Sequence, residues 1–132
     1  MTVTIWHNPK CGTSRNALEM IRATGVEPVV VEYLKTPPDA TALARVAKAV
    51  GGAKALMRVK GTPAEELGLV DADDAGILAA MATHPILINR PVVIGPRGIV
   101  LARPSELALT VLDGALPGDF TKEDGEKVPR SA

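Results

Sequence analysis

The chain has 132 residues, of which 46% are apolar and 2% aromatic, and its formal charges cancel. This length suits one domain with a proper core. The zero net charge offers no general attraction to nucleic acid or to an anionic membrane. No apolar run reaches membrane-spanning length, and the first residues enter a strand directly, without a signal-peptide pattern. We therefore expect a cytoplasmic protein that binds neither nucleic acid nor membranes, and we assign it no metal site and no tightly bound cofactor.

The first elements in chain order form a strand, a helix and a second strand. Val3 to Trp6 read as a short buried strand, and apolar residues at helical spacing then run from near Thr13 until Gly25 ends the helix. Val29 to Val31 form a β-branched run that continues towards Tyr33, which is typical of a central strand covered on both faces. The short joints predict a βαβ unit with a parallel strand pair.

A helical insertion is expected over about residues 39–83. A helix begins after Asp39 and is stopped by Gly51-Gly52, and residues 53–58 give a further short helical piece. Residues 64–67 form another helical turn. The acidic residues from Asp71 to Asp74 then cap a helix that runs to about Thr83.

The last part of the chain predicts two strands and one helix. Val92–Ile94 and Ile99–Leu101 flank a tight turn and indicate an antiparallel hairpin. A final helix opens with Pro104 in its first turn. From Gly114 the sequence becomes polar, and we expect a surface tail over about 114–132. The order β-α-β, helical insertion, β-β-α predicts a single thioredoxin-like α/β domain over residues 1–132, with a mixed four-stranded sheet.

Cys11, the only cysteine, stands at the junction between the first expected strand and the first expected helix. The first N–H groups of a helix have no intrahelical partners and carry partial positive charge, so they favour a thiolate and can hold an oxyanion. Gly12 and Thr13 add little bulk, while Lys10 and Arg15 add positive charge. A lone cysteine is often only a small buried hydrophobe, but apolar packing would require none of these neighbours. The loop therefore predicts a nucleophile and an anion site together.

The position of Pro91 adds to the thioredoxin-like reading. In that fold the redox cysteine lies between the first strand and the first helix, and a proline opens the third strand, as Pro91 does here. X–Pro bonds are cis in only about 5% of cases. A cis Arg90–Pro91 bond is therefore a hypothesis.

The sequence resembles the glutaredoxin-linked arsenate reductases of bacteria, which have a thioredoxin-like fold. The resemblance is carried by blocks that span nearly the whole chain in order. The blocks are residues 7–15 (HNPKCGTSR), 33–38 (YLKTPP), 66–69 (ELGL), 84–91 (HPILINRP), 103–106 (RPSE) and 120–127 (FTKEDGEK).

The resemblance implies that Cys11 is the nucleophile and that arsenate is the oxyanion substrate. It also implies an anion clamp of three arginines, which are Arg58, Arg90 and Arg103. Arginine suits this task because it presents a fork of donors and stays charged at any working pH. Gly12 and Thr13 are expected to offer main-chain N–H groups to the same oxyanion.

Three further residues are implied as support for the cysteine: His7, Ser14 and Arg15. An imidazolium at His7 would favour the thiolate, which is otherwise a minority at pH 7 for a free pKa of about 8.5. The alternative for His7 is an ordinary histidine at a strand end, bonded to the backbone.

The single thiol constrains the reaction cycle. After attack on arsenate a Cys11–arsenic adduct remains, and the chain has no second cysteine to resolve it. The resemblance implies that glutathione and then a glutaredoxin supply the missing thiols. The products would be arsenite and oxidised glutathione, with glutathione acting as a co-substrate.

Other function classes fit less well. Phosphatase-like reductases need an arginine where this chain has Ala17, and dithiol oxidoreductases need a second cysteine where it has Ser14. A general monothiol, glutathione-dependent oxidoreductase stays open. So does an Spx-type transcription regulator, which shares the fold but binds RNA polymerase, although such redox sensors commonly carry a cysteine pair.

Overall fold

The computed structural model describes residues 2–131. The chain divides into two compact units. The first combines the segment up to Glu32 with the segment from Arg90 onward, and the second is Tyr33–Asn89. Each unit is described by itself below.

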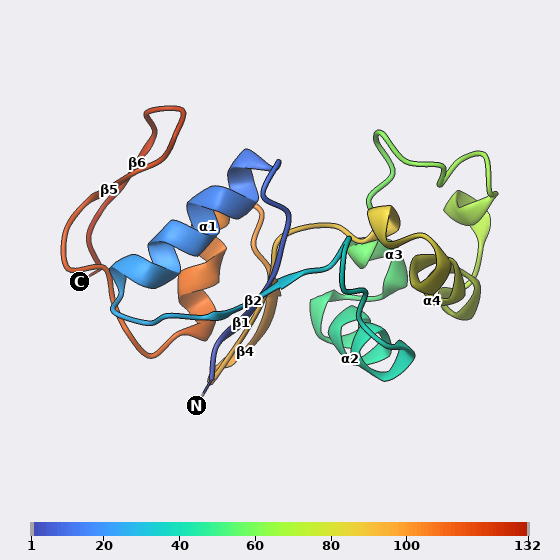
Figure 1. Cartoon of the computed structure of the whole chain (residues 1–132), viewed down its shortest axis with the longest axis horizontal. Helices are drawn as coiled ribbons and strands as arrows, with labels where there is room; N and C mark the ends of the chain where they lie inside the picture. Colours follow the sequence, from blue (N-terminus) through green and yellow to red (C-terminus); the bar gives the residue numbers. More distant parts are fainter. Residues whose placement is uncertain (1, 132) are drawn as a thin grey trace. The chain divides into compact units, whose positions relative to one another are not determined.

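The first unit is built on a four-stranded sheet with the order β2-β1-β3-β4. Its strands are β1 (Thr4–His7), β2 (Val29–Glu32), β3 (Val92–Gly95) and β4 (Gly98–Leu101). β1 runs parallel to β2 and antiparallel to β3, and β3 and β4 form an antiparallel hairpin. This arrangement confirms the predicted α/β class, the parallel βαβ pair and the mixed sheet (Figure 1).

The prediction that Val29–Val31 form a central strand is wrong. β2 pairs only with β1 and is an edge of the sheet, where Val29 is 51% exposed and Val30 37%. A β-branched run indicates that these residues prefer an extended backbone. This preference does not determine whether the strand lies at the centre or at the edge of a sheet. The central strands are β1 and β3.

Two helical segments of the first unit, α1 (Gly12–Ala23) and η3 (Ser105–Val111), lie side by side (Figure 1). The second is a 3₁₀ helix, entered at Pro104. Both contribute to the main core of this unit together with strand residues. The fully or nearly fully buried members of that core are Val3, Ile5, Ala17, Leu18, Ile21, Val93, Ala102, Ala108, Val111 and Leu112.

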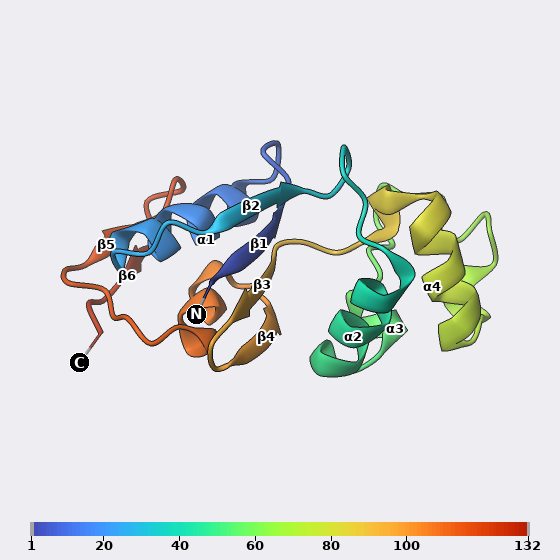
Figure 2. The same ribbon diagram turned by 60° about the horizontal axis from the view of Figure 1, so that its bottom comes forward.

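The polar C-terminal segment, which we expected to be a surface tail, forms a β-hairpin that packs against the rest of the first unit. β5 (Phe120–Thr121) pairs with β6 (Lys127–Val128), and the hairpin lies beside α1 (Figure 2). A small apolar cluster of Met20, Leu116 and Val128 joins it to that helix. The Lys122 side chain is only 7% exposed, and its Nζ donates to Glu106 and Glu126 at 3.0 and 2.8 Å. The polar composition of the segment did not indicate this packing, because one of its anchoring residues is a lysine that is buried with its charge paired.

The second unit is helical, as expected for the insertion. Its elements are α2 (Ala40–Val50), α3 (Ala53–Leu56), η1 (Leu69–Asp71), α4 (Asp74–Thr83) and η2 (Pro85–Leu87). The Asp39 and Asp73 carboxylates cap α2 and α4, each accepting a main-chain N–H at 2.8 Å. α2 ends at Gly51, whose φ of 109° only glycine adopts readily. Among residues 2–131, no helix has the length and apolar character needed to cross a bilayer.

Candidate active site

The loop between β1 and α1 is closed by hydrogen bonds to Asn8. The Asn8 carbonyl accepts the Cys11 N–H at 3.0 Å, and its Oδ1 accepts the Lys10 N–H at 3.0 Å. Cys11 is the N-cap residue of α1, and its own carbonyl accepts the N–H of Arg15 at 3.0 Å. Cys11 as a residue is 9% exposed. Gly12 and Thr13 are the first two residues of the helix, so their N–H groups are among those with no acceptor within the helix.

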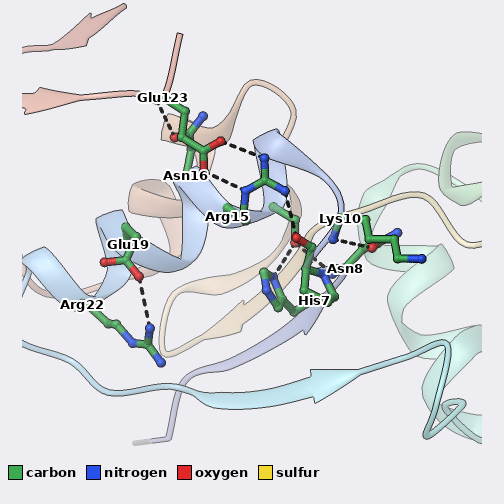
Figure 3. Close-up of polar contacts among 10 residues, drawn as sticks. His7, Asn8, Lys10, Arg15, Asn16, Glu19, Arg22 and Glu123 are labelled. Carbon is green, nitrogen blue, oxygen red and sulfur yellow. Dashed lines mark hydrogen bonds and ion pairs between the residues drawn. The ribbon is translucent and has the colours of Figure 1, made fainter. Parts of the chain in front are cut away.

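His7 is connected to this loop through Ser14. The Ser14 hydroxyl lies 2.7 Å from His7 Nδ1 and accepts the Asn8 N–H at 3.0 Å, and His7 and Asn8 lie next to each other in Figure 3. Burial lowers the pKa of His7, the positive charges of Arg22 and Arg15 lower it further, and Glu32 opposes them. This shift favours the neutral imidazole at pH 7. This argues against the imidazolium that we expected beside Cys11 and leaves His7 as a hydrogen-bond partner of Ser14.

Two of the three expected clamp arginines gather at the thiol. Arg103 Nη1 lies 3.9 Å from Cys11 Sγ and donates to the Arg90 carbonyl at 3.1 Å. The main-chain path brings both residues here, because each stands at the entry to an element, Arg90 before β3 and Arg103 before η3. The Arg90–Pro91 bond is cis, as hypothesised, and so is Arg103–Pro104.

The charges and donors around Cys11 favour its thiolate. Burial raises the pKa of the thiol and is the largest influence on it, but the others together outweigh burial. The Ser14 main-chain N–H, the charge of Arg90, and the hydrogen bond and charge of Arg103 all lower it, so the net pKa lies below its usual value. A thiolate held in this way is the form that attacks electrophiles.

The third arginine belongs to the other unit. Arg58 lies after α3, where its main-chain N–H donates to the Leu87 carbonyl at 2.8 Å and its Nε donates to the Lys60 carbonyl at 3.1 Å. Its place in the anion clamp stays a prediction.

Arg15 is held by protein groups in a way that the sequence did not indicate. Its Nε and Nη2 donate to the two carboxylate oxygens of Glu123, each at 2.8 Å, and its Nη1 donates to the Pro9 carbonyl at 2.8 Å (Figure 3). Glu123 is the functional-site residue that sequence reasoning missed, since it stands 108 positions away in the chain and its block suggested no role for it.

The site can therefore carry out nucleophilic chemistry on an anion. It combines a thiol of lowered pKa, the start of a helix and two guanidinium groups, which together attract a negatively charged electrophile and favour the thiolate form of the attacking sulfur. Among residues 2–131, no group of three or more histidine, cysteine, aspartate or glutamate side chains is arranged to hold a metal ion.

Comparison with known proteins gives one consistent result. The model of the ArsC family matches residues 6–111. The chain belongs to the ArsC family. An arsenate reductase of Rhizobium meliloti is 55% identical over 131 residues, covering 97% of this chain and 94% of the relative. An arsenate reductase of Escherichia coli K12 is 50% identical over 129 residues, covering 96% and 92%.

Solved structures of ArsC relatives agree with the fold. The structure of an arsenate reductase from Vibrio cholerae superposes with a TM-score of 0.80 at 40% identity, covering 85% of this chain and 98% of the other. The family match includes the Cys11 loop and reaches past Arg103. Cys11, Arg90 and Arg103 therefore lie within the part of the chain that the family model matches, and Glu123 lies beyond it.

Proposed function

We propose that this protein is an arsenate reductase that works through a Cys11–arsenic adduct and takes its electrons from glutathione and a glutaredoxin. The observation that carries the proposal is the contact of Arg103 with the Cys11 sulfur at the start of α1. This contact occurs in a chain that belongs to the ArsC family. The curated relatives named above, which align over nearly the full chain, are called arsenate reductases.

The first step is attack by the Cys11 thiolate on arsenic. A sulfur–arsenic bond forms and one arsenic–oxygen bond breaks, and the oxygen leaves as water after protonation. Arg90 and Arg103 neutralise the negative charge of the oxyanion as the two anions approach each other. Arsenic stays at the +5 level in this step, so no electrons have yet been transferred.

Reduction of arsenic by two electrons requires two thiols that end as one disulfide. In this proposal the glutathione thiolate attacks the Cys11 sulfur of the adduct. The sulfur–arsenic bond breaks, its electron pair reduces arsenic to the +3 level, and arsenite leaves together with a Cys11–glutathione disulfide. A glutaredoxin thiol then takes over the glutathione and regenerates Cys11, and a second glutathione releases the glutaredoxin, forming oxidised glutathione. The net balance is arsenate and two glutathione thiols giving arsenite, water and oxidised glutathione. The lone cysteine of this chain supports an external source of both electrons.

A coupled assay tests the proposal. Arsenate, glutathione, a glutaredoxin, glutathione reductase and NADPH are combined with the protein, and NADPH oxidation is followed. We expect arsenate-dependent oxidation that disappears in Cys11→Ser, because a hydroxyl is far less acidic than a thiol and does not form the adduct. Full activity in Cys11→Ser would refute the mechanism. No activity in the native protein, together with capture of RNA polymerase, would favour an Spx-type regulator.

A further inference from the structure

The C-terminal hairpin reaches the catalytic loop through one ion pair. Arg15, in the first turn of α1, forms a two-pronged bond with Glu123 in the turn between β5 and β6, each contact at 2.8 Å. The same guanidinium donates its remaining arm to the Pro9 carbonyl at 2.8 Å. One planar group therefore joins the hairpin to the residue two positions before Cys11.

The ion pair lies directly against the start of the helix. A Cβ built on Gly12, the residue after Cys11, would lie 3.7 Å from Arg15 Nη2 and 3.8 Å from Glu123 Oε1. Asn16 adds a second contact, because its Oδ1 accepts the main-chain N–H of Glu123 at 3.1 Å (Figure 3). Glu123 therefore contacts two consecutive residues near the start of α1, and Arg15 extends the connection to Pro9 on the other side of Cys11.

We infer that Glu123 is a positioning residue, which acts through Arg15 to hold the Pro9–Gly12 segment so that Cys11 Sγ stays within reach of the Ser14 N–H and Arg103. The donors of Arg15 that would suit an oxyanion are engaged with Glu123 and Pro9, which assigns Arg15 to the support of the loop and not to the anion clamp. This inference rests on the proposed role of Cys11 as nucleophile.

The hairpin has other anchors, so the link can be tested without detaching it. Lys122 is buried between Glu106 and Glu126, and Val128 packs with Met20 and Leu116. The contact of Asn16 is with the Glu123 main chain, which a side-chain substitution leaves in place. Glu123→Gln therefore removes the negative charge and one of the two acceptor oxygens, so that the two-pronged bond cannot form, and it keeps the hairpin docked.

Charge and positioning predict opposite results for this variant. Glu123→Gln leaves the positive charge of Arg15 without its carboxylate, and by Coulomb's law alone this lowers the pKa of Cys11 and speeds its reaction. Loss of positioning moves the sulfur away from the Ser14 N–H and from Arg103. This raises the pKa of Cys11 and slows the reaction of its thiol with an electrophile. Arg15→Lys keeps the charge but cannot fork to Glu123 and reach Pro9 at once, so only positioning predicts a change there.

The experiment measures the rate at which iodoacetamide alkylates Cys11 as a function of pH. The readout is specific because the chain has no other thiol. We expect Glu123→Gln and Arg15→Lys each to alkylate about three- to tenfold more slowly than the native protein at neutral pH, with the pH profile displaced upward. The matched control is Asp113→Asn, which removes the same charge from the exposed Arg97–Asp113 pair and should leave the rate unchanged.

An alkylation rate equal to or above that of the native protein in either variant, with cooperative unfolding retained, would overturn the inference. Alkylation requires neither arsenate nor glutathione. The result therefore stands apart from the outcome of the coupled assay, and failure of the proposed function and failure of this inference can be told apart.

Discussion

At the Cys11 sulfur, burial and charge act in opposite directions on the same proton. Burial raises the pKa of the thiol, while the Ser14 N–H, Arg90 and Arg103 lower it, and the net result is a lowered pKa. The pKa of Cys11 therefore depends on a few nearby groups, and the effect of removing a side chain among them can be measured. Among them, Arg103 contacts the sulfur through its side chain, with Nη1 at 3.9 Å.

Removal of Arg103 should weaken the site in two ways. In Arg103→Ala we expect the pKa of Cys11 to rise, because a cation and a donor to the thiolate are lost, and arsenate reduction to fall by about 10²-fold. The pH dependence of alkylation and the coupled assay measure the two effects. The control is Arg97→Ala, since Arg97 lies in the same unit but bonds to Asp113 at 3.0 Å. Equal losses in both variants would contradict a specific role for Arg103.

His7 predicts a pH dependence of stability. Its pKa in the folded protein is below the ordinary value of 6.5, chiefly because of burial, so the unfolded chain binds the proton first as the pH falls. The free energy of unfolding should decrease from about pH 6.5 down to the folded pKa, by at most about 1.4 kcal/mol per pH unit, and become flat with respect to this group below that. Urea unfolding of the native protein and of His7→Gln measures it. An identical slope in the variant would show that another group is responsible.

At the scale of elements, the site depends on how closely η3 approaches the β3–β4 hairpin. A Cβ on Gly95, at the end of β3, would overlap the Val111 carbonyl oxygen and lie 3.1 Å from the carbonyl carbon. These are main-chain atoms of η3, so no side-chain rotation can relieve the contact. Only glycine allows this approach, and η3 begins two residues after Arg103.

Gly95→Ala should therefore destabilise the protein by about 1–3 kcal/mol, as overpacking in a closed core does. Thermal or urea unfolding measures the loss. The matched control is Gly118→Ala, where a Cβ has no heavy atom within 4 Å, so its stability should stay within about 0.5 kcal/mol of the native value. Equal stability of the two variants would contradict the close packing of η3 on β3.

At the scale of the whole molecule, a single thiol serves a reaction that needs two electrons. With arsenate but no added thiol, dilute protein should release no arsenite, because Cys11 has no partner in the chain with which to form a disulfide. Addition of glutathione and glutaredoxin should start the release. Chromatographic quantification of arsenite measures both. Stoichiometric arsenite in the absence of external thiol would contradict the proposed cycle.

Much of the first unit could be predicted from sequence because its signals are local. The β1–α1 junction and the hairpin of β3 and β4 follow from residue types at short spacing, and the structure confirms them. The same holds in the second unit for the starts of α2 and α4 at Asp39 and Asp73. Cys11 could be identified in the same way, since a thiol next to a helix start is a local feature. The position of β2 at the edge of the sheet could not be predicted in this way, because it depends on which strands lie beside it.

The sequence by itself determined the α/β class, the order of the elements and the position of the thiol at the start of the first helix. Only the tertiary structure decided what surrounds that thiol. It brought Arg103 to the sulfur, buried His7 so that its pKa is lowered, and folded the polar C-terminal segment into a hairpin whose Glu123 bonds to Arg15. The physical reason is the same in each case: burial, and charge contacts between residues as far as 108 positions apart, leave no trace in the local pattern.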